Sequence, residues 1–147
     1  MQNIFNEKTY KSIRQRIESL QPDAIRQFGI MDMAQMLAHC NSQLDIATGI
    51  LKLQDESTFF RRNIIRRVLP YFNTIPKGTE TSESLKVKDA RQFAVEKQKL
   101  LGTLDTIYKR GVKAEWYPHP AFGKMSGREW AHLIPLHLDH HLRQFSN

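Results

Sequence analysis

The 147-residue sequence lacks the features that mark several large classes of protein. Its single cysteine, Cys40, excludes an internal disulfide and is typical of a reducing compartment. No apolar run approaches the roughly 20 residues of a membrane-spanning helix, and the first residues contain no apolar stretch of signal-peptide type. Glycine and proline are few, and no internal repeat or low-complexity segment is present. We therefore expect one cytoplasmic domain over residues 1–147, long enough to bury a core.

The chain is basic, with 22 Lys and Arg residues against 15 Asp and Glu and a formal net charge of +7. This balance raises nucleic acid or another acidic surface as a partner. The densest basic stretch contains Arg61, Arg62, Arg66 and Arg67, but aromatic residues are not interleaved through it as in a base-stacking platform. The pattern therefore favours a solvated helix face and disfavours a nucleic-acid partner.

Helical periodicity runs through the whole chain, without convincing β alternation. Four long amphipathic helices are predicted over about residues 4–20, 32–54, 88–110 and 127–145. Asp32 with Gln35 and Ser126 with Glu129 have the spacing of capping boxes at the starts of the second and last helices. Pro22 and Gly111 are predicted stops, and Pro135 should bend the last helix or loosen one turn of it.

Three connecting segments are expected to be less regular. Residues 59–72 predict a shorter or bent helix that ends at Pro70, and residues 74–84 predict a loop. Residues 116–123 contain three aromatic residues, two prolines and a glycine, which predicts an ordered loop packed by its own rings. Four long helices with short to moderate connections predict an all-α four-helix bundle, with the extra helical segment across one side or end.

Three of the six histidines fall within five consecutive positions near the end of the sequence. His137 and His141 are four residues apart, so a helix stacks them on one face. With Trp130 at zero and about 100° per residue, His137 lies near 340° and His141 near 20°, inside the apolar arc. His140 lies at the edge of that arc, at about 280°, and His132 lies on the polar side, at about 200°.

Two imidazoles within an apolar stripe require partners, because unpaired buried polar groups are costly. A shared divalent metal ion satisfies both rings. Hydrogen bonds to carbonyl groups or to Gln144, one turn beyond His141 on the same face, satisfy them equally well. Gln144 is also suited to hold a metal-bound ring in place. The histidine pair alone leaves the metal site and the structural alternative open.

A metal site in a bundle takes further ligands from facing helices. His39, beside Gln43 on the second predicted helix, is the main candidate, although a lone histidine on the flank of an apolar stripe is more often a satisfied, half-buried residue. Cys40 lies within the stripe and is predicted to be a core residue, not a ligand or nucleophile. His119 in the 116–123 loop is a candidate for a pocket mouth or for a residue fixed by local packing.

Several segments together resemble the DinB/YfiT-like superfamily of four-helix-bundle metalloproteins. Residues 33–39, MAQMLAH, are similar to the motif that carries its first ligand, and residues 137–144, HLDHHLRQ, are similar to its C-terminal motif. Residues 119–123, HPAFG, and the following Glu129-Trp130 resemble one branch of it, domain of unknown function 1569. The resemblance extends over nearly the whole chain.

That resemblance implies an up-down-down-up bundle in which His39, His137 and His141 hold a divalent metal ion such as Zn²⁺, Ni²⁺ or Fe²⁺. Three histidines leave coordination positions open for water or substrate. Characterised relatives include thiol transferases and a maleylpyruvate isomerase that uses a thiol. The implied function is a metal-dependent enzyme, such as a transferase that joins a low-molecular-weight thiol to an electrophilic substrate.

Four further residues are candidates for groups that line the pocket or hold the ligand rings: Gln43, His119, His140 and Gln144. Relatives often dimerise through bundle faces, so a homodimer is the oligomer that the resemblance implies. The alternative to an enzyme is a non-catalytic bundle, either stabilised by the metal or binding nucleic acid or a protein through its basic surface.

Overall fold

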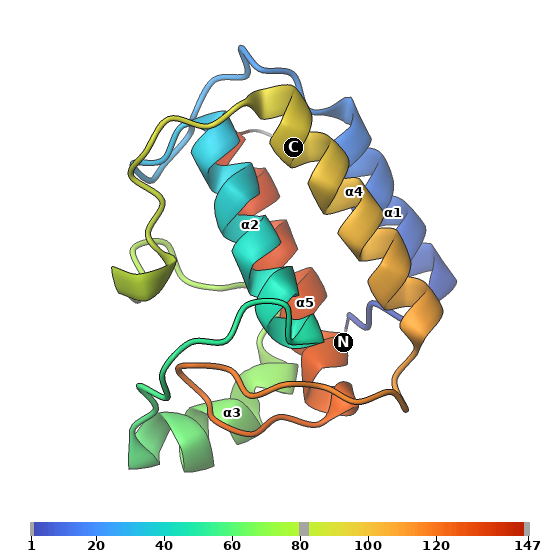
Figure 1. Ribbon diagram of the computed structural model, residues 1–147, viewed down its shortest axis with the longest axis vertical. Coiled ribbons are helices and arrows are strands. Elements are labelled where there is room, and N and C mark those ends of the chain that lie inside the picture. The colour runs from blue at the N-terminus through green and yellow to red at the C-terminus, as the bar shows by residue number, and fades with distance from the viewer. Residues whose placement is uncertain (1, 80–82, 146–147) are drawn as a thin grey trace.

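The computed structural model describes residues 2–79 and 83–145, and the regular elements assigned within them are helices (Figure 1). The long helices are α1 (Glu7–Ser19), α2 (Met33–Thr48), α4 (Phe93–Arg110) and α5 (Gly127–Leu142). A π-helical turn (Arg61–Ile65), α3 (Arg66–Val68) and a 3-10 turn (Leu69–Tyr71) follow α2, and further 3-10 turns span Glu83–Leu85 and Arg143–Phe145. The all-α prediction is confirmed.

Both predicted capping boxes are present. Asp32 Oδ1 accepts a hydrogen bond from the Gln35 N–H at 2.8 Å, while Gln35 Oε1 accepts one from the Asp32 N–H at 3.0 Å. Ser126 and Glu129 make the same reciprocal pair at the start of α5, at 3.3 and 2.7 Å. These boxes satisfy N–H groups that a helix start leaves without partners. They fix the starts of the two helices that carry most of the histidines.

Several element boundaries differ from the predictions. α2 ends at Thr48 instead of near residue 54, because Gly49 takes a left-handed φ of +82°. An added Cβ at Gly49 would meet the Tyr117 ring, so packing also favours glycine at this position. α4 begins at Phe93 instead of near residue 88. Pro70 lies inside the 3-10 turn that follows α3 and does not end that segment. Residues 80–82 of the predicted 74–84 loop lie outside the described residues.

The four long helices lie side by side, with α1 and α5 running in one direction and α2 and α4 in the other (Figure 1). The main contacts of α2 are with α4 and α5, and those of α1 are with the same two helices. α1 and α2 therefore lie diagonally across the group, as do α4 and α5, whereas α2 and α4 are neighbours. The arrangement is compatible with the predicted bundle.

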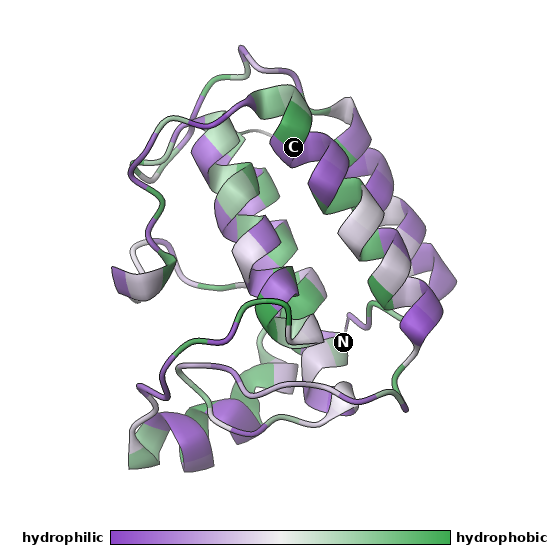
Figure 2. Ribbon diagram, viewed as in Figure 1, coloured by the Kyte–Doolittle hydropathy of each residue, from purple (hydrophilic) through white to green (hydrophobic). Residues whose placement is uncertain are grey.

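The apolar core lies between these four helices. Its largest fully buried side chains include Ile17, Met36, Leu104, Trp130 and Ile134. Hydrophilic residues gather on the outer faces of α1 and α4 (Figure 2). α2 is buried on nearly all sides, so the predicted apolar stripe is only part of its buried surface. None of the described helices has the length and apolar composition that crossing a membrane requires.

Candidate metal centre

Three histidine side chains from two helices meet between α2 and α5. His39 comes from α2, and His137 and His141 come from successive turns of α5. One ring nitrogen of each lies within 4.8 Å of those of the other two. The ring centroids of His39 lie 5.0 Å from His137 and 4.6 Å from His141, and the latter two are 4.5 Å apart. We call these three side chains the histidine cluster.

Hydrogen bonds fix two rings of the histidine cluster. His39 Nδ1 lies 2.9 Å from the Leu85 carbonyl oxygen, and His141 Nδ1 lies 2.7 Å from Gln144 Oε1. Because a carbonyl oxygen only accepts, each Nδ1 carries the ring proton and donates it. The Nε2 atoms of both rings therefore keep their lone pairs, and such oriented, neutral imidazoles are the form in which histidine binds a metal ion.

His137 completes the triangle. Its Nε2 lies 3.0 Å from His39 Nε2, while its Nδ1 is buried without a hydrogen-bond partner among the described residues. Two nitrogens bound to one ion at about 2.0–2.1 Å are separated by roughly 2.8–3.4 Å in octahedral or tetrahedral geometry. The observed spacing of the two Nε2 atoms therefore fits a shared ion as well as a direct hydrogen bond between the rings.

Burial keeps the histidine cluster uncharged. Desolvation lowers the pKa of His39 below its ordinary value. The pKa values of His137 and His141 are lowered further, first by desolvation and then by neighbouring imidazoles. Neutral rings keep the lone pairs that metal binding requires. Three such nitrogens form a donor set that suits Zn²⁺, Ni²⁺ or Fe²⁺.

The other candidate residues surround the histidine cluster. His140, predicted at the edge of the apolar arc, is buried, and its Nδ1 donates to the Ile75 carbonyl oxygen at 3.1 Å. Its ring centroid lies 5.0 Å from that of His141. Gln43 is buried on the same side of α2 as His39. His132, predicted to face water, is partly exposed and contacts the Gln2 carbonyl oxygen.

His119 reaches the same place from the predicted ordered loop. Its Nδ1 accepts a hydrogen bond from the Ala121 N–H at 3.0 Å, and its ring stacks on Phe122 with centroids 4.7 Å apart. Burial lowers the pKa of His119 to about 4, so the ring is neutral at neutral pH. Trp130 Nε1 anchors the loop by donating to the Tyr117 carbonyl oxygen at 2.9 Å. His119 is thus both fixed by local packing and part of the wall of a cleft.

That cleft has a volume of about 380 Å³ and opens onto the histidine cluster. His119 and His140 line it together with the three clustered rings, and most of the remaining wall is apolar, including Ile65, Leu69, Phe72, Phe122 and Leu133. A volume of this size lies in the range of small-molecule sites. A small molecule in the cleft can therefore reach the imidazole nitrogens.

The family described as "Protein of unknown function (DUF1569)" matches residues 6–147. The chain belongs to this family. The search of curated proteins and the search of solved structures gave no match. Family membership agrees with the branch that the 119–123 and 129–130 segments resemble, and the family description assigns no activity.

The sequence of this DUF1569 chain does not predict two of the contacts around the histidine cluster. The partners of His39 and His140 are the main-chain carbonyl groups of Leu85 and Ile75, which lie in the irregular connection between α2 and α4. A main-chain carbonyl carries no residue-type signal, so no pattern in the sequence identifies it. Gln144, in contrast, was a candidate because its side chain falls on the face of His141.

The basic stretch of this DUF1569 chain is partly neutralised by ion pairs. Arg62 pairs with Asp55 at 2.7 Å, and Arg66 pairs with Glu129 at 3.0 Å. Arg61 and Arg67 are exposed. The stretch therefore presents fewer free cations than its composition suggests, which weakens the case for a phosphate-binding surface.

Proposed function

We propose that this protein binds one divalent metal ion through His39, His137 and His141 and is an enzyme that uses this ion. The observation that carries the proposal is the pair of hydrogen bonds at Nδ1 of His39 and Nδ1 of His141, which sets the tautomer of both rings. Both donate Nδ1–H to a carbonyl oxygen, and so offer unprotonated Nε2 atoms within reach of a common centre. The 3.0 Å approach of His137 Nε2 to His39 Nε2 supports the same centre.

We also propose that the four long helices form the up-down-down-up bundle of the DinB/YfiT-like superfamily. The directions of the helices support this assignment (Figure 1). So does the placement of the two resembling motifs, since residues 33–39 lie on α2 and most of residues 137–144 lie on the facing α5. Bundles of this kind build metal sites from side chains on facing helices.

The ion, Zn²⁺, Ni²⁺ or Fe²⁺, would supply Lewis acidity that lowers the pKa of a thiol brought to it. Three histidine ligands would leave coordination positions of the ion open to water or substrate. A ligand packed against the apolar walls would displace water from the cleft and so strengthen electrostatic interactions within it. Leu85 and Gln144 hold two of the rings in orientation.

Among the described residues that line the cleft, none is a cysteine or a serine. Cys40 is buried in the core, and burial raises the pKa of its thiol well above the ordinary range, so it stays protonated. A substrate thiol brought to the ion would supply a nucleophile instead. This supports a transferase that joins a low-molecular-weight thiol to an electrophile.

The test of the metal site is the metal content of tag-free protein after loading with Zn²⁺ or Ni²⁺ and removal of excess ion. We expect one equivalent in the wild type and in His132→Ala, which removes a partly exposed histidine of the same helix. We expect none in His137→Ala. A wild type that binds no stoichiometric metal would rule out the proposal.

Turnover separates an enzyme from a bundle that uses metal only for stability. Metal-loaded protein is incubated with a panel of thiols and electrophiles, and loss of free thiol is followed over time. We expect consumption that depends on the metal and disappears in His137→Ala. If stoichiometric metal is bound and no pair reacts, the transferase is excluded while the metal site stands.

A further inference from the structure

Arg61 lines the cleft and is the one charged side chain among the described residues that do so. Its guanidinium makes no hydrogen bond or ion pair within residues 2–79 and 83–145. Neighbouring Arg62 and Arg66 are engaged by Asp55 and Glu129. An arginine is charged at any physiological pH and presents a planar fork of donors that matches a carboxylate. Among the described residues, Arg61 thus has no acidic partner and is the only charged group at the wall of the cleft.

Apolar rings beside Arg61 are exposed to water. Phe60 and Phe72 line the same cleft and are 57% and 43% exposed. Exposed apolar area that is continuous with a cleft marks a surface that a ligand covers. Ile65 and Leu69 continue the apolar wall inward towards the histidine cluster.

We propose that the cleft binds a small organic anion whose carboxylate pairs with Arg61 and whose apolar body lies against Phe60 and Phe72. A single cation in an apolar setting matches a single negative charge, since a second charge there lacks a partner. The binding of the anion does not depend on the proposed function. Only the role of the anion does: if the histidine cluster holds a metal ion, the apolar monocarboxylate is one substrate of that site.

The probes are 4-phenylbutyrate and its neutral amide, 4-phenylbutyramide, which share shape and apolar body. Binding of each is measured by isothermal titration calorimetry to metal-free and Zn²⁺-loaded protein. We expect the carboxylate to bind about tenfold or more tightly than the amide, as for a hydrogen-bonded charge. Arg61→Gln should abolish this preference.

Arg67→Gln is the matched control, because it removes the same charge from an exposed residue of the same segment outside the cleft. It should keep the wild-type preference. Equal binding of the two probes, no binding of either, or a preference that survives in Arg61→Gln would overturn the proposal. If Arg61→Gln keeps the preference for the carboxylate only when it is loaded with Zn²⁺, the carboxylate binds the ion and not Arg61. The protein could also take up no metal and still prefer the carboxylate through Arg61. That result would support the anion site, while the proposed metal function would fail.

Discussion

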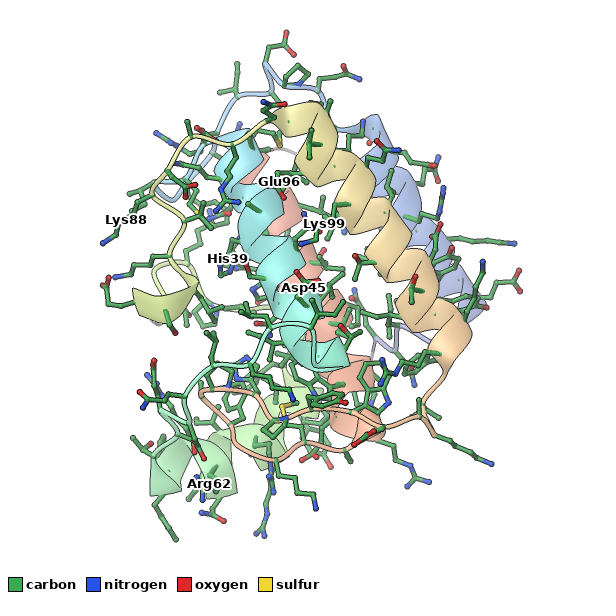
Figure 3. All side chains as sticks on the ribbon, in the orientation of Figure 1. His39, Asp45, Arg62, Lys88, Glu96 and Lys99 are labelled. Atoms are coloured by element: carbon green, nitrogen blue, oxygen red, sulfur yellow. The ribbon has the colours of Figure 1, made fainter. Side chains whose placement is uncertain are left out.

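Two clusters of polar side chains, each with buried members, lie on opposite faces of α2, and they are built in different ways. Towards α5 lies the histidine cluster. Towards α4 lies a second group, which we call the α2–α4 seam, consisting of Asn41, Asp45, Glu96 and Lys99. Figure 3 shows Asp45, Glu96 and Lys99 between α2 and α4, with His39 on the other side of α2.

In the seam, unlike groups meet. Asn41 Nδ2 donates to Glu96 Oε2 at 2.8 Å and to the Glu96 carbonyl oxygen at 3.0 Å. Lys99 Nζ pairs with Asp45 Oδ2 at 2.7 Å. Each member has one partner of complementary charge or hydrogen-bonding type, which offsets part of the cost of burial, although Asn41 Oδ1 and Asp45 Oδ1 are buried without a partner in the described parts of the chain. The seam therefore contributes to the fold itself.

In the histidine cluster, like groups meet. The Nε2 atoms of His39 and His137 face each other at 3.0 Å, and His137 Nδ1 is buried without a partner in the described parts of the chain. No acid lines the cleft among the described residues to balance a proton on these rings. The Nε2 atoms of His39 and His141 are both acceptors, and the single N–H of a neutral His137 can serve only one of them, so the set is suited to a cation. The contrast supports the proposal that the histidine cluster serves binding, whereas the seam ties α2 to α4.

The largest expected effect is on metal affinity. His137→Leu should weaken Zn²⁺ binding by at least about 100-fold, the upper end of what loss of an outer partner costs, because it removes a ligand. A competition titration against a chromophoric chelator measures the dissociation constant. Asn41→Leu, which breaks the seam, should leave that constant unchanged. Equal losses in both variants would erase the distinction between the two regions.

Metal should also stabilise the fold through the histidine cluster. Zn²⁺ at 100 times its dissociation constant adds about 2.7 kcal/mol to the free energy of unfolding. For a chain of this size, that corresponds to a rise in Tm of about 5–10 °C. Differential scanning calorimetry of the wild type should show the shift, and His137→Leu should lack it. A wild-type Tm that does not respond to Zn²⁺ contradicts a native-state site.

Metal-free stability should show the reverse pattern. Asn41→Leu removes the donor to a mostly buried carboxylate and should lower the free energy of unfolding by about 1–3 kcal/mol. His137→Leu should lower it by less than about 1 kcal/mol, because the change also removes the unpartnered Nδ1 and the cleft admits water to the remaining rings. Urea denaturation measures both values. A larger loss in His137→Leu than in Asn41→Leu would make the cluster structural.

The smallest expected effect concerns the group that orients His141. Gln144→Met keeps the length of the side chain but removes the acceptor for His141 Nδ1, and should weaken Zn²⁺ binding about tenfold. Gly29, in the connection between α1 and α2, packs against the Gln144 amide, and a Cβ added to Gly29 would lie 2.5 Å from Gln144 Nε2. This connection therefore helps to position the amide. Gln43→Met, within the same cleft, is the control and should bind Zn²⁺ like the wild type. Unchanged affinity in Gln144→Met would mean that the hydrogen bond does not orient a ligand.

What the sequence predicted well depends on residues close together in the chain. The spacing of His137 and His141, the position of Gln144 and both capping boxes follow from helix geometry over one turn. The all-α class follows from periodicity over longer stretches. These features are set locally, and packing elsewhere did not change them.

What the sequence missed depends on contacts between distant segments. The Leu85 and Ile75 carbonyl groups meet their histidines only because the connection between α2 and α4 folds back over the cleft. The seam was missed because α2 was expected to bury one stripe, whereas its packing against both α4 and α5 buries Asn41 and Asp45 as well. His140 is buried for the same kind of reason, since the Ile75 segment covers it.

The most direct measurement is anomalous X-ray diffraction at the zinc absorption edge from a crystal of Zn²⁺-loaded, tag-free protein. A site in the histidine cluster predicts one strong peak about 2.0–2.1 Å from the Nε2 atoms of His39, His137 and His141. A crystal with Zn²⁺ in its medium and no peak at that position, or peaks only at surface residues such as His132, would contradict the metal centre.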